Sequence, residues 1–115
     1  MSKHKIFLMP FAQLYPLYLN KALKKGRSQD EVDQIIFWLT GYDHCSLAKQ
    51  IKENISLEDF FNSAPRFNPN ASLITGAICG VKVEEITNKT MQRIRYLDKL
   101  IDELAKGKSL DKILR

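Results

Sequence analysis

The clearest folding signal in the chain is SQDEVDQIIFWLTG, residues 28–41. Ser28 and Glu31 stand three residues apart in the capping-box pattern, in which each side chain accepts a hydrogen bond from the other residue's backbone N–H. Gly41 follows as a typical helix stop. Between these ends, apolar residues recur at i, i+3, i+4 and i+7, the spacing of one helix face. They are Val32, Ile35, Ile36 and Leu39. The segment therefore predicts a helix that buries one face.

On the N-terminal side, apolar residues from Phe11 to Leu23 also recur at helical spacing and stop before Gly26. Pro16 lies within this run, and proline is tolerated only in the first turn of a straight helix. Either the helix begins near Pro16, or it is kinked there. Residues 5–9 are apolar apart from Lys5 and predict a short strand or an extended arm that ends at Pro10.

On the C-terminal side, capping residues and glycine or proline stops divide the chain into further short helices. The expected helices cover residues 43–54, 56–65, 69–79, 89–106 and 109–114. Connections of two to five residues between short helices indicate steep crossings and not an up-down bundle of equal helices. We therefore expect an all-α orthogonal bundle of six to seven short helices, with at most one short N-terminal strand. Residues 1–115 are expected to form a single helical domain.

Composition places the chain among ordinary globular domains, with 44% hydrophobic and 27% charged residues over 115 positions. Two cysteines, Cys45 and Cys79, are too few for a disulfide scaffold and favour a reducing compartment. The apolar run of residues 6–19 is interrupted by prolines and lacks a cleavage site, and no uninterrupted run reaches the ~18 residues of a membrane span. We expect a cytoplasmic protein that does not enter a membrane.

Charge is distributed unevenly along the chain, which carries a formal net charge of +5. Residues 1–27 hold six basic residues and no acidic ones, residues 28–62 hold seven acidic residues and two basic ones, and residues 63–115 are again basic. Such segments either polarise the surface toward anionic partners or pair with one another in the folded protein.

No established catalytic pattern stands out in the sequence. His44 and Cys45 are adjacent, and adjacent helical side chains do not face each other. The acid pairs at residues 58–59 and 84–85 each begin a helix, where the helix dipole accounts for them. There is no phosphate-binding glycine loop and no Cys/His metal spacing, so we expect no metal and no cofactor. The sequence favours a small non-enzymatic binding or interaction module, and it identifies neither a partner nor an oligomeric state.

An alternative is a small ligand-binding protein or enzyme with an aromatic pocket. Small helical bundles place ligand sites between their helices, and aromatic side chains commonly line such sites. Aromatic residues at helical spacing are also common in ordinary cores. The candidate ligand residues are Tyr15, Tyr18, Trp38, Tyr42 and Asp43.

A second alternative is a nucleic-acid binder. The segment from Gly76 to Ile86 has the glycine and apolar spacing of a helix-turn-helix. The candidate phosphate-binding residues are Lys82, Lys89, Arg93 and Arg95. Against this, Glu84 and Glu85 would begin the recognition helix and repel phosphate. We therefore expect no sequence-specific duplex binding and at most weak attraction through the basic residues.

Taken along its whole length, the chain resembles an uncharacterised bacterial family known as domain of unknown function 2200. The resemblance implies a small stand-alone bacterial protein and carries no activity, cofactor or catalytic residue with it. In the first half of the chain, the resemblance rests on the segments Lys3-His4-Lys5-Ile6, Phe11-Ala12, Tyr15-Pro16-Leu17-Tyr18, Lys24-Lys25-Gly26-Arg27 and Trp38-Leu39-Thr40-Gly41-Tyr42-Asp43. Those in the second half are Ala64-Pro65, Asn68-Pro69-Asn70, Leu73-Ile74-Thr75-Gly76, Cys79-Gly80-Val81, Val83-Glu84-Glu85-Ile86 and Ile94-Arg95-Tyr96-Leu97-Asp98-Lys99-Leu100.

The apolar stripes also predict which residues form the core: Ile35, Ile36, Leu39, Phe60, Leu73, Ile94, Leu97, Ile101 and Leu104. Replacing Ile36 with alanine should lower the free energy of unfolding by about 2–5 kcal/mol, because a fully buried isoleucine leaves a cavity behind. Chemical denaturation measures this change. A loss below about 0.5 kcal/mol, the range of ordinary surface substitutions, would show that the stripe faces solvent.

Overall fold

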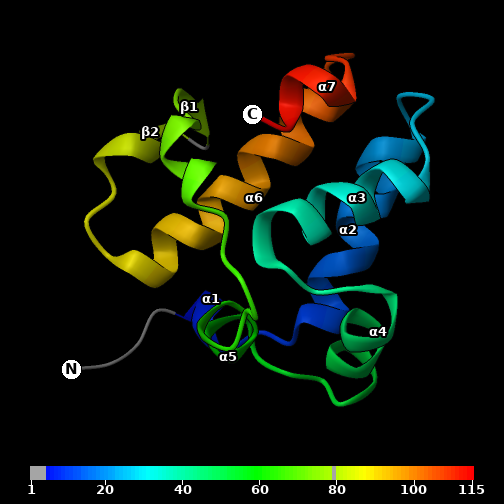
Figure 1. Ribbon diagram of the computed structural model, residues 1–115, viewed down its shortest axis with the longest axis vertical. Helices are drawn as coiled ribbons and strands as arrows, with labels where there is room; N and C mark the ends of the chain where they lie inside the picture. Colours follow the sequence, from blue (N-terminus) through cyan, green and yellow to red (C-terminus); the bar gives the residue numbers. More distant parts are fainter. Residues whose placement is uncertain (1–4, 79) are drawn as a thin grey trace.

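Helix α6, Lys89–Ala105, runs through the middle of the protein (Figure 1). The computed structural model describes residues 5–78 and 80–115. Within them, α6 contacts α2 (Phe11–Leu23), α3 (Gln29–Thr40), α5 (Leu57–Asn62) and α7 (Leu110–Ile113). One face of α6 is completely withdrawn from solvent, and it consists of Ile94, Leu97, Leu100, Ile101 and Leu104. The hydrophobic core of the protein is therefore built around this face.

The described residues contain seven α-helices, two 3-10 helices and one small antiparallel sheet. The remaining elements are α1 (Lys5–Leu8), α4 (His44–Lys52), η1 (Pro69–Leu73), β1 (Ala77–Ile78), β2 (Val81–Lys82) and η2 (Val83–Glu85). Figure 1 shows α5 nearly end-on while α3 and α6 lie across the view, so the helices cross steeply. The predicted fold class, an orthogonal bundle of short helices, is confirmed. None of the described helices is both long and apolar enough to span a lipid bilayer.

Helix α3 forms as its sequence predicts. The Glu31 backbone N–H donates to the Ser28 hydroxyl at 3.2 Å, and the Ser28 backbone N–H donates to the Glu31 carboxylate at 3.0 Å. All four residues of its apolar stripe are fully buried. Of the nine predicted core residues, eight have no exposed surface, and Ile36 is among them. The prediction is wrong for Leu73, whose side chain is 58% exposed.

The predicted N-terminal strand is wrong, because residues Lys5–Leu8 form the short helix α1. Extended pairing occurs just after it. The Phe11 N–H donates to the Ile55 carbonyl at 2.8 Å, and the Leu57 N–H donates to the Met9 carbonyl at 2.8 Å. The extended pairing is therefore limited to a single antiparallel bridge between Pro10 and Ser56. Helix α2 begins at Phe11 and continues through Pro16, whose side of the helix is exposed.

The predicted helix over residues 69–79 is also wrong. Only the 3-10 helix η1 forms, and β1 and β2 then pair antiparallel; the expected helix end at Cys79 lies outside the described residues. Gly76 has φ of +109°, which ends any right-handed helix there. Its N–H donates to the Glu84 carboxylate at 3.1 Å. The segment from Gly76 to Ile86 is therefore not a helix-turn-helix in its described residues, but a hairpin followed by η2.

Residues 66–68 close over the C-terminal end of α3. The Arg66 N–H donates to the Thr40 carbonyl at 3.0 Å, and the Asn68 N–H donates to the Leu39 carbonyl at 2.9 Å. The last carbonyls of a helix have no partner within it, so residues 66–68 satisfy two of them. A β-carbon on Gly41 would lie 2.7 Å from the Arg66 backbone nitrogen. The close approach of the two segments therefore depends on glycine at position 41.

A non-glycine residue with a left-handed backbone conformation costs about 1–2 kcal/mol. Replacing Gly41 with alanine should lower the free energy of unfolding by more than this. The φ of Gly41 is +83°, and the new methyl group would also push residues 66–68 away from α3. The matched control is Gly26→Ala, because Gly26 has φ of +76° and open space where a β-carbon would lie. Urea denaturation compares the two variants. Equal losses of stability would contradict the close packing at Gly41.

Candidate functional site

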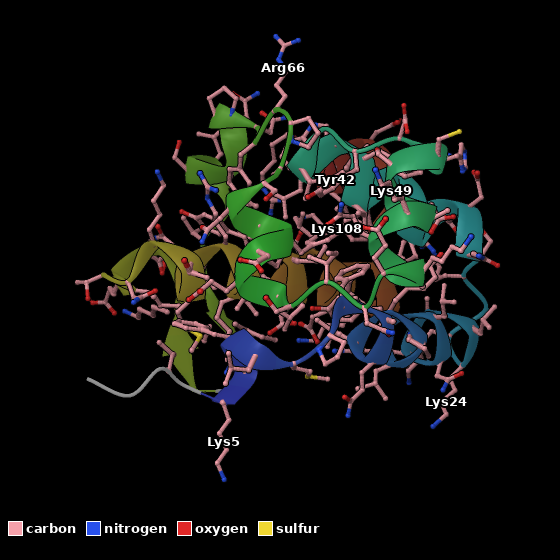
Figure 2. The ribbon with its side chains drawn as sticks, turned by 90° about the horizontal axis from the view of Figure 1, so that it is seen from below. Lys5, Lys24, Tyr42, Lys49, Arg66 and Lys108 are labelled. Atoms are coloured by element: carbon pink, nitrogen blue, oxygen red, sulfur yellow. The ribbon has the colours of Figure 1, made fainter. Side chains whose placement is uncertain are left out.

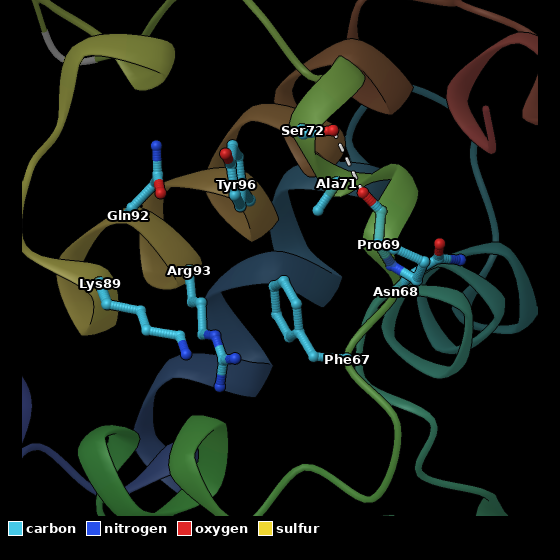
Figure 3. A pocket seen from close by; sticks show the side chains of 9 residues that line it. All are labelled: Phe67, Asn68, Pro69, Ala71, Ser72, Lys89, Gln92, Arg93 and Tyr96. Atoms are coloured by element: carbon cyan, nitrogen blue, oxygen red, sulfur yellow. Dashed lines mark hydrogen bonds between the residues drawn. The ribbon is translucent and has the colours of Figure 1, made fainter.

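A polar face of α6 lies next to its buried face. Lys89, Gln92, Arg93 and Tyr96 are spaced at i, i+3, i+4 and i+7, so they share one side of the helix. Together with the segment that leads from Phe67 into η1, they enclose a pocket of about 200 Å³ (Figure 3). The pocket is lined by Phe67, Asn68, Pro69, Ala71, Ser72, Lys89, Gln92, Arg93 and Tyr96.

Arg93 is the best-positioned charge in this pocket. Its guanidinium carbon lies 4.2 Å from the centre of the Phe67 ring, within the range of a cation–π contact. Its Nη1 donates to the Phe61 carbonyl at 2.9 Å, which fixes one edge of the guanidinium group. Partial burial lowers the pKa of Arg93, but the ordinary pKa of a guanidinium group is so high that Arg93 remains charged at neutral pH. Within the described residues, Arg93 has no carboxylate partner.

Lys89 adds a second cation one helical turn before Arg93. Figure 3 shows both side chains extending from α6 toward the same space beside Phe67. Lys89 is exposed, and it forms no ion pair with the residues that the structure describes. Like charges at i and i+4 repel each other. No aspartate or glutamate lines the pocket, so nothing in its wall compensates these two charges.

Tyr96 completes the polar face with a hydroxyl group that makes no hydrogen bond to any described residue. The Tyr96 side chain is mostly buried and lies beside Phe67, with 6.5 Å between the two ring centres. Burial, and then the nearby charge of Glu84, raises the pKa of Tyr96. The hydroxyl therefore stays protonated at neutral pH and is available as a donor. Figure 3 shows this hydroxyl directed away from Lys89 and Arg93, so the two cations and the aromatic wall are the features that suit the pocket to an anionic group.

The four candidate nucleic-acid residues fall into two groups. Lys89 and Arg93 meet in the pocket, whereas Arg95 points to another face of α6 and pairs with Asp98 at 2.9 Å. Lys82 lies exposed on β2. The helix-turn-helix that would have aligned all four does not form in the described residues. A nucleic-acid role for them stays a prediction, and it no longer has this motif as its basis.

The candidate aromatic residues are distributed through the bundle. The Tyr15 hydroxyl donates to Asp33 and the Tyr18 hydroxyl donates to Asp98, which ties α2 to α3 and to α6. The Tyr42 hydroxyl donates to the Phe60 carbonyl at 2.6 Å, and Figure 2 shows Tyr42 inside the molecule. The hydroxyl groups of these three tyrosines therefore form hydrogen bonds between different elements of the bundle.

The other two members of that candidate group lie elsewhere. Asp43 caps α4 by accepting from the Ser46 N–H at 2.8 Å, which lowers the pKa of its carboxyl group. Trp38 lines a hollow on the far side of Asn68, and Tyr18 lines a different one beside Ile78. A shared ligand role for the five residues stays a prediction.

Among the described residues, the remaining candidates His44 and Cys45 form neither a nucleophile–base pair nor a metal centre. Cys45 is exposed and unbridged, and His44 packs edge-on against Phe37 with 4.7 Å between ring centres. Cys79 lies outside the described residues. Among the described side chains, no three His, Cys, Asp or Glu residues gather closely enough to hold a metal ion.

The sequence reasoning missed Phe67, Gln92 and Tyr96 as site residues. The signal that was available is the polar i, i+3, i+4, i+7 spacing that begins at Lys89, beside the apolar stripe of the same helix. That spacing predicts which residues share one face of the helix, but it does not predict that Phe67 packs over this face.

All four tyrosines of the chain have raised pKa values. Burial is the main cause in each, and it raises the pKa of Tyr15 and of Tyr42 to about 12. Burial raises the pKa of Tyr18 well above its ordinary value, and the nearby carboxylate of Asp98 raises it further. Below pH 10 the folded and unfolded states both keep these protons. Between pH 10 and about 12 only the folded state keeps the protons of Tyr15 and Tyr42, so stability falls as pH rises through that window.

A spectrophotometric titration checks this arrangement. At pH 10, where exposed tyrosine is half ionised, the phenolate absorbance at 295 nm of the native protein should stay far below that of the urea-denatured protein. The denatured sample is the internal control, because it contains the same four phenols. Native midpoints near pH 10 for two or more tyrosines would contradict their burial.

Comparison with known proteins places residues 5–115 of the chain in one family. A family model described as "Uncharacterized protein conserved in bacteria" (DUF2200) matches residues 5–115. A solved structure, "Crystal structure of uncharacterized protein SP1917", superimposes with a TM-score of 0.91 at 41% identity, covering 98% of this chain and 93% of that one. No curated protein matches the chain. The match over nearly every residue shows that this chain belongs to the DUF2200 family of bacterial proteins.

Proposed function

We propose that the protein is a small non-enzymatic binding module whose site is the pocket between α6 and residues Phe67–Ser72. The observation that carries the proposal is the pair of cations, Lys89 and Arg93, that face one pocket without a carboxylate partner among the described residues. An anionic group bound there would relieve their mutual repulsion and accept hydrogen bonds from both. The module would act as one helical domain.

The wall of the pocket supports this proposal. Asn68 is fixed by its bonds to α3, and Arg93 is held from one side by the Phe61 carbonyl. Donors that are already in place lose little freedom when a ligand binds. We further propose that the protein works in the cytoplasm, because an exposed free thiol such as Cys45 persists in a reducing compartment.

Inorganic phosphate is the simplest probe of the site. Hydrogen bonds to charged groups contribute about 1.5–3 kcal/mol each. Two of them correspond to a dissociation constant on the order of 1 mM. We expect phosphate to bind in this range and to shift the amide NMR signals of residues 67–72 and 89–96. Arg93→Met should abolish binding, and Lys89→Met should weaken it several-fold.

The matched control is Lys24→Met, which removes the same charge from the end of α2. Figure 2 shows Lys24 extending into solvent. This variant should bind phosphate as the native protein does. Arg93→Lys keeps the charge but loses the planar group over Phe67, so it should bind more weakly while remaining folded. If shifts spread over all exposed lysines, or persist in Arg93→Met, the pocket is not the site.

A further inference from the structure

A second hollow adjoins the anion pocket. It has a volume of about 360 Å³ and lies between the end of α3 and the beginning of η1. Two of its lining residues, Asn68 and Pro69, also line the first pocket, so the two hollows are neighbours across a shared ridge. The other residues that line it are Phe37, Trp38, Gly41, Arg66 and Asn70.

The shared ridge is rigid. The Asn68 amide nitrogen donates to the Trp38 carbonyl at 3.1 Å, and its amide oxygen accepts from the Asn70 N–H at 2.9 Å. The Asn68 backbone N–H donates to the Leu39 carbonyl, and the ring of Pro69 fixes the φ angle of Pro69 itself. The relative position of the two hollows is therefore set before any ligand arrives.

Size and lining indicate that the two hollows form one site. Ligand pockets in proteins measure about 300–1,000 Å³, so the first hollow alone falls below this range, while the two together lie well within it. Neither wall contains an acidic residue. The second hollow offers the partly buried rings of Phe37 and Trp38, which suit a flat apolar group. Arg66 lies at its rim, and Figure 2 shows its side chain reaching into solvent.

We propose that both hollows hold a single small ligand, consisting of a flat aromatic ring joined by a short linker to a carboxylate or a phosphate. The anionic end lies against Arg93 and Lys89, and the ring lies against Trp38 across the Asn68–Pro69 ridge. This inference rests on the proposed function, because it takes the anion pocket as one half of the site. The same chemistry occurs in nucleoside monophosphates and in aromatic carboxylic acids.

Trp38 allows a direct test, because it is the only tryptophan in the chain. The probes are adenosine monophosphate and hippurate, with adenosine and hippuramide as their uncharged counterparts, and phosphate and acetate as anions without a ring. We expect at least one ring-bearing anion to change Trp38 fluorescence and to bind about ten-fold or more tightly than its ringless anion, as stacking on an aromatic side chain allows. Its uncharged counterpart should bind at least about ten-fold more weakly. The probe that binds more tightly shows whether the ligand belongs to the nucleoside monophosphates or to the aromatic carboxylic acids.

Variants separate the two halves of the site. Phe37→Leu keeps the fluorescent residue and should reduce the affinity for the ring-bearing anion without changing phosphate binding. Lys89→Met should weaken both, and Lys24→Met should weaken neither. If phosphate binds the pocket but the ring adds no affinity and leaves Trp38 fluorescence unchanged, the inference is wrong and the proposed function stands. If neither phosphate nor the ring-bearing anions bind, both are wrong.

Discussion

Three carbonyl groups at the C-terminal end of α3 lack hydrogen-bond donors within the helix. Residues 66–68 supply those donors. Arg66 and Asn68 donate backbone N–H groups to Thr40 and Leu39, and the Asn68 side chain donates to Trp38. An unpaired buried carbonyl costs about 1–3 kcal/mol, so this attachment is a strong constraint on the chain between α5 and η1. It places Phe67 over Arg93, and it creates the ridge that separates the two hollows. The position of Phe67 and of the ridge therefore depends on this contact between segments that are nearly thirty residues apart in the sequence.

Helix α2 is attached to the rest of the bundle by a second kind of constraint, a pair of tyrosine–aspartate hydrogen bonds. Tyr15 reaches Asp33 on α3, and Tyr18 reaches Asp98 on α6. A buried carboxylate needs such donors, because an unpaired buried charge is costly. The uneven charge along the chain is partly balanced in the same way, since Lys21 of the basic N-terminal segment pairs with Asp102 at 3.3 Å. Lys89 and Arg93, like several exposed lysines, form no ion pair with a described acidic residue, and what distinguishes these two is that they face one pocket.

The fold class and most of the core could be predicted from the sequence, whereas the segment between residues 69 and 86 could not. The caps at Ser28, Asp43 and Ser56 all form as their local patterns indicate. The small apolar residues after Pro69 also match a helix, yet only a 3-10 turn forms before Gly76 adopts a positive φ. Periodicity does not distinguish a short buried helix from a hairpin when the residues are small and apolar. The bond from the Gly76 N–H to Glu84 is a contact eight residues along the chain, which no helical pattern contains.

For the candidate site, the sequence alone determined the polar face of α6, because side-chain spacing on a helix is fixed by its 3.6-residue period. Lys89 and Arg93 were therefore recognisable as neighbours, although a helix-turn-helix was the wrong reason for grouping them with Lys82 and Arg95. Only the tertiary structure decided that Phe67 and the ridge at Asn68 cover that face. Such contacts depend on how distant segments satisfy the free carbonyls of α3 and pack around Gly41, and these requirements are not written in any local pattern of residues.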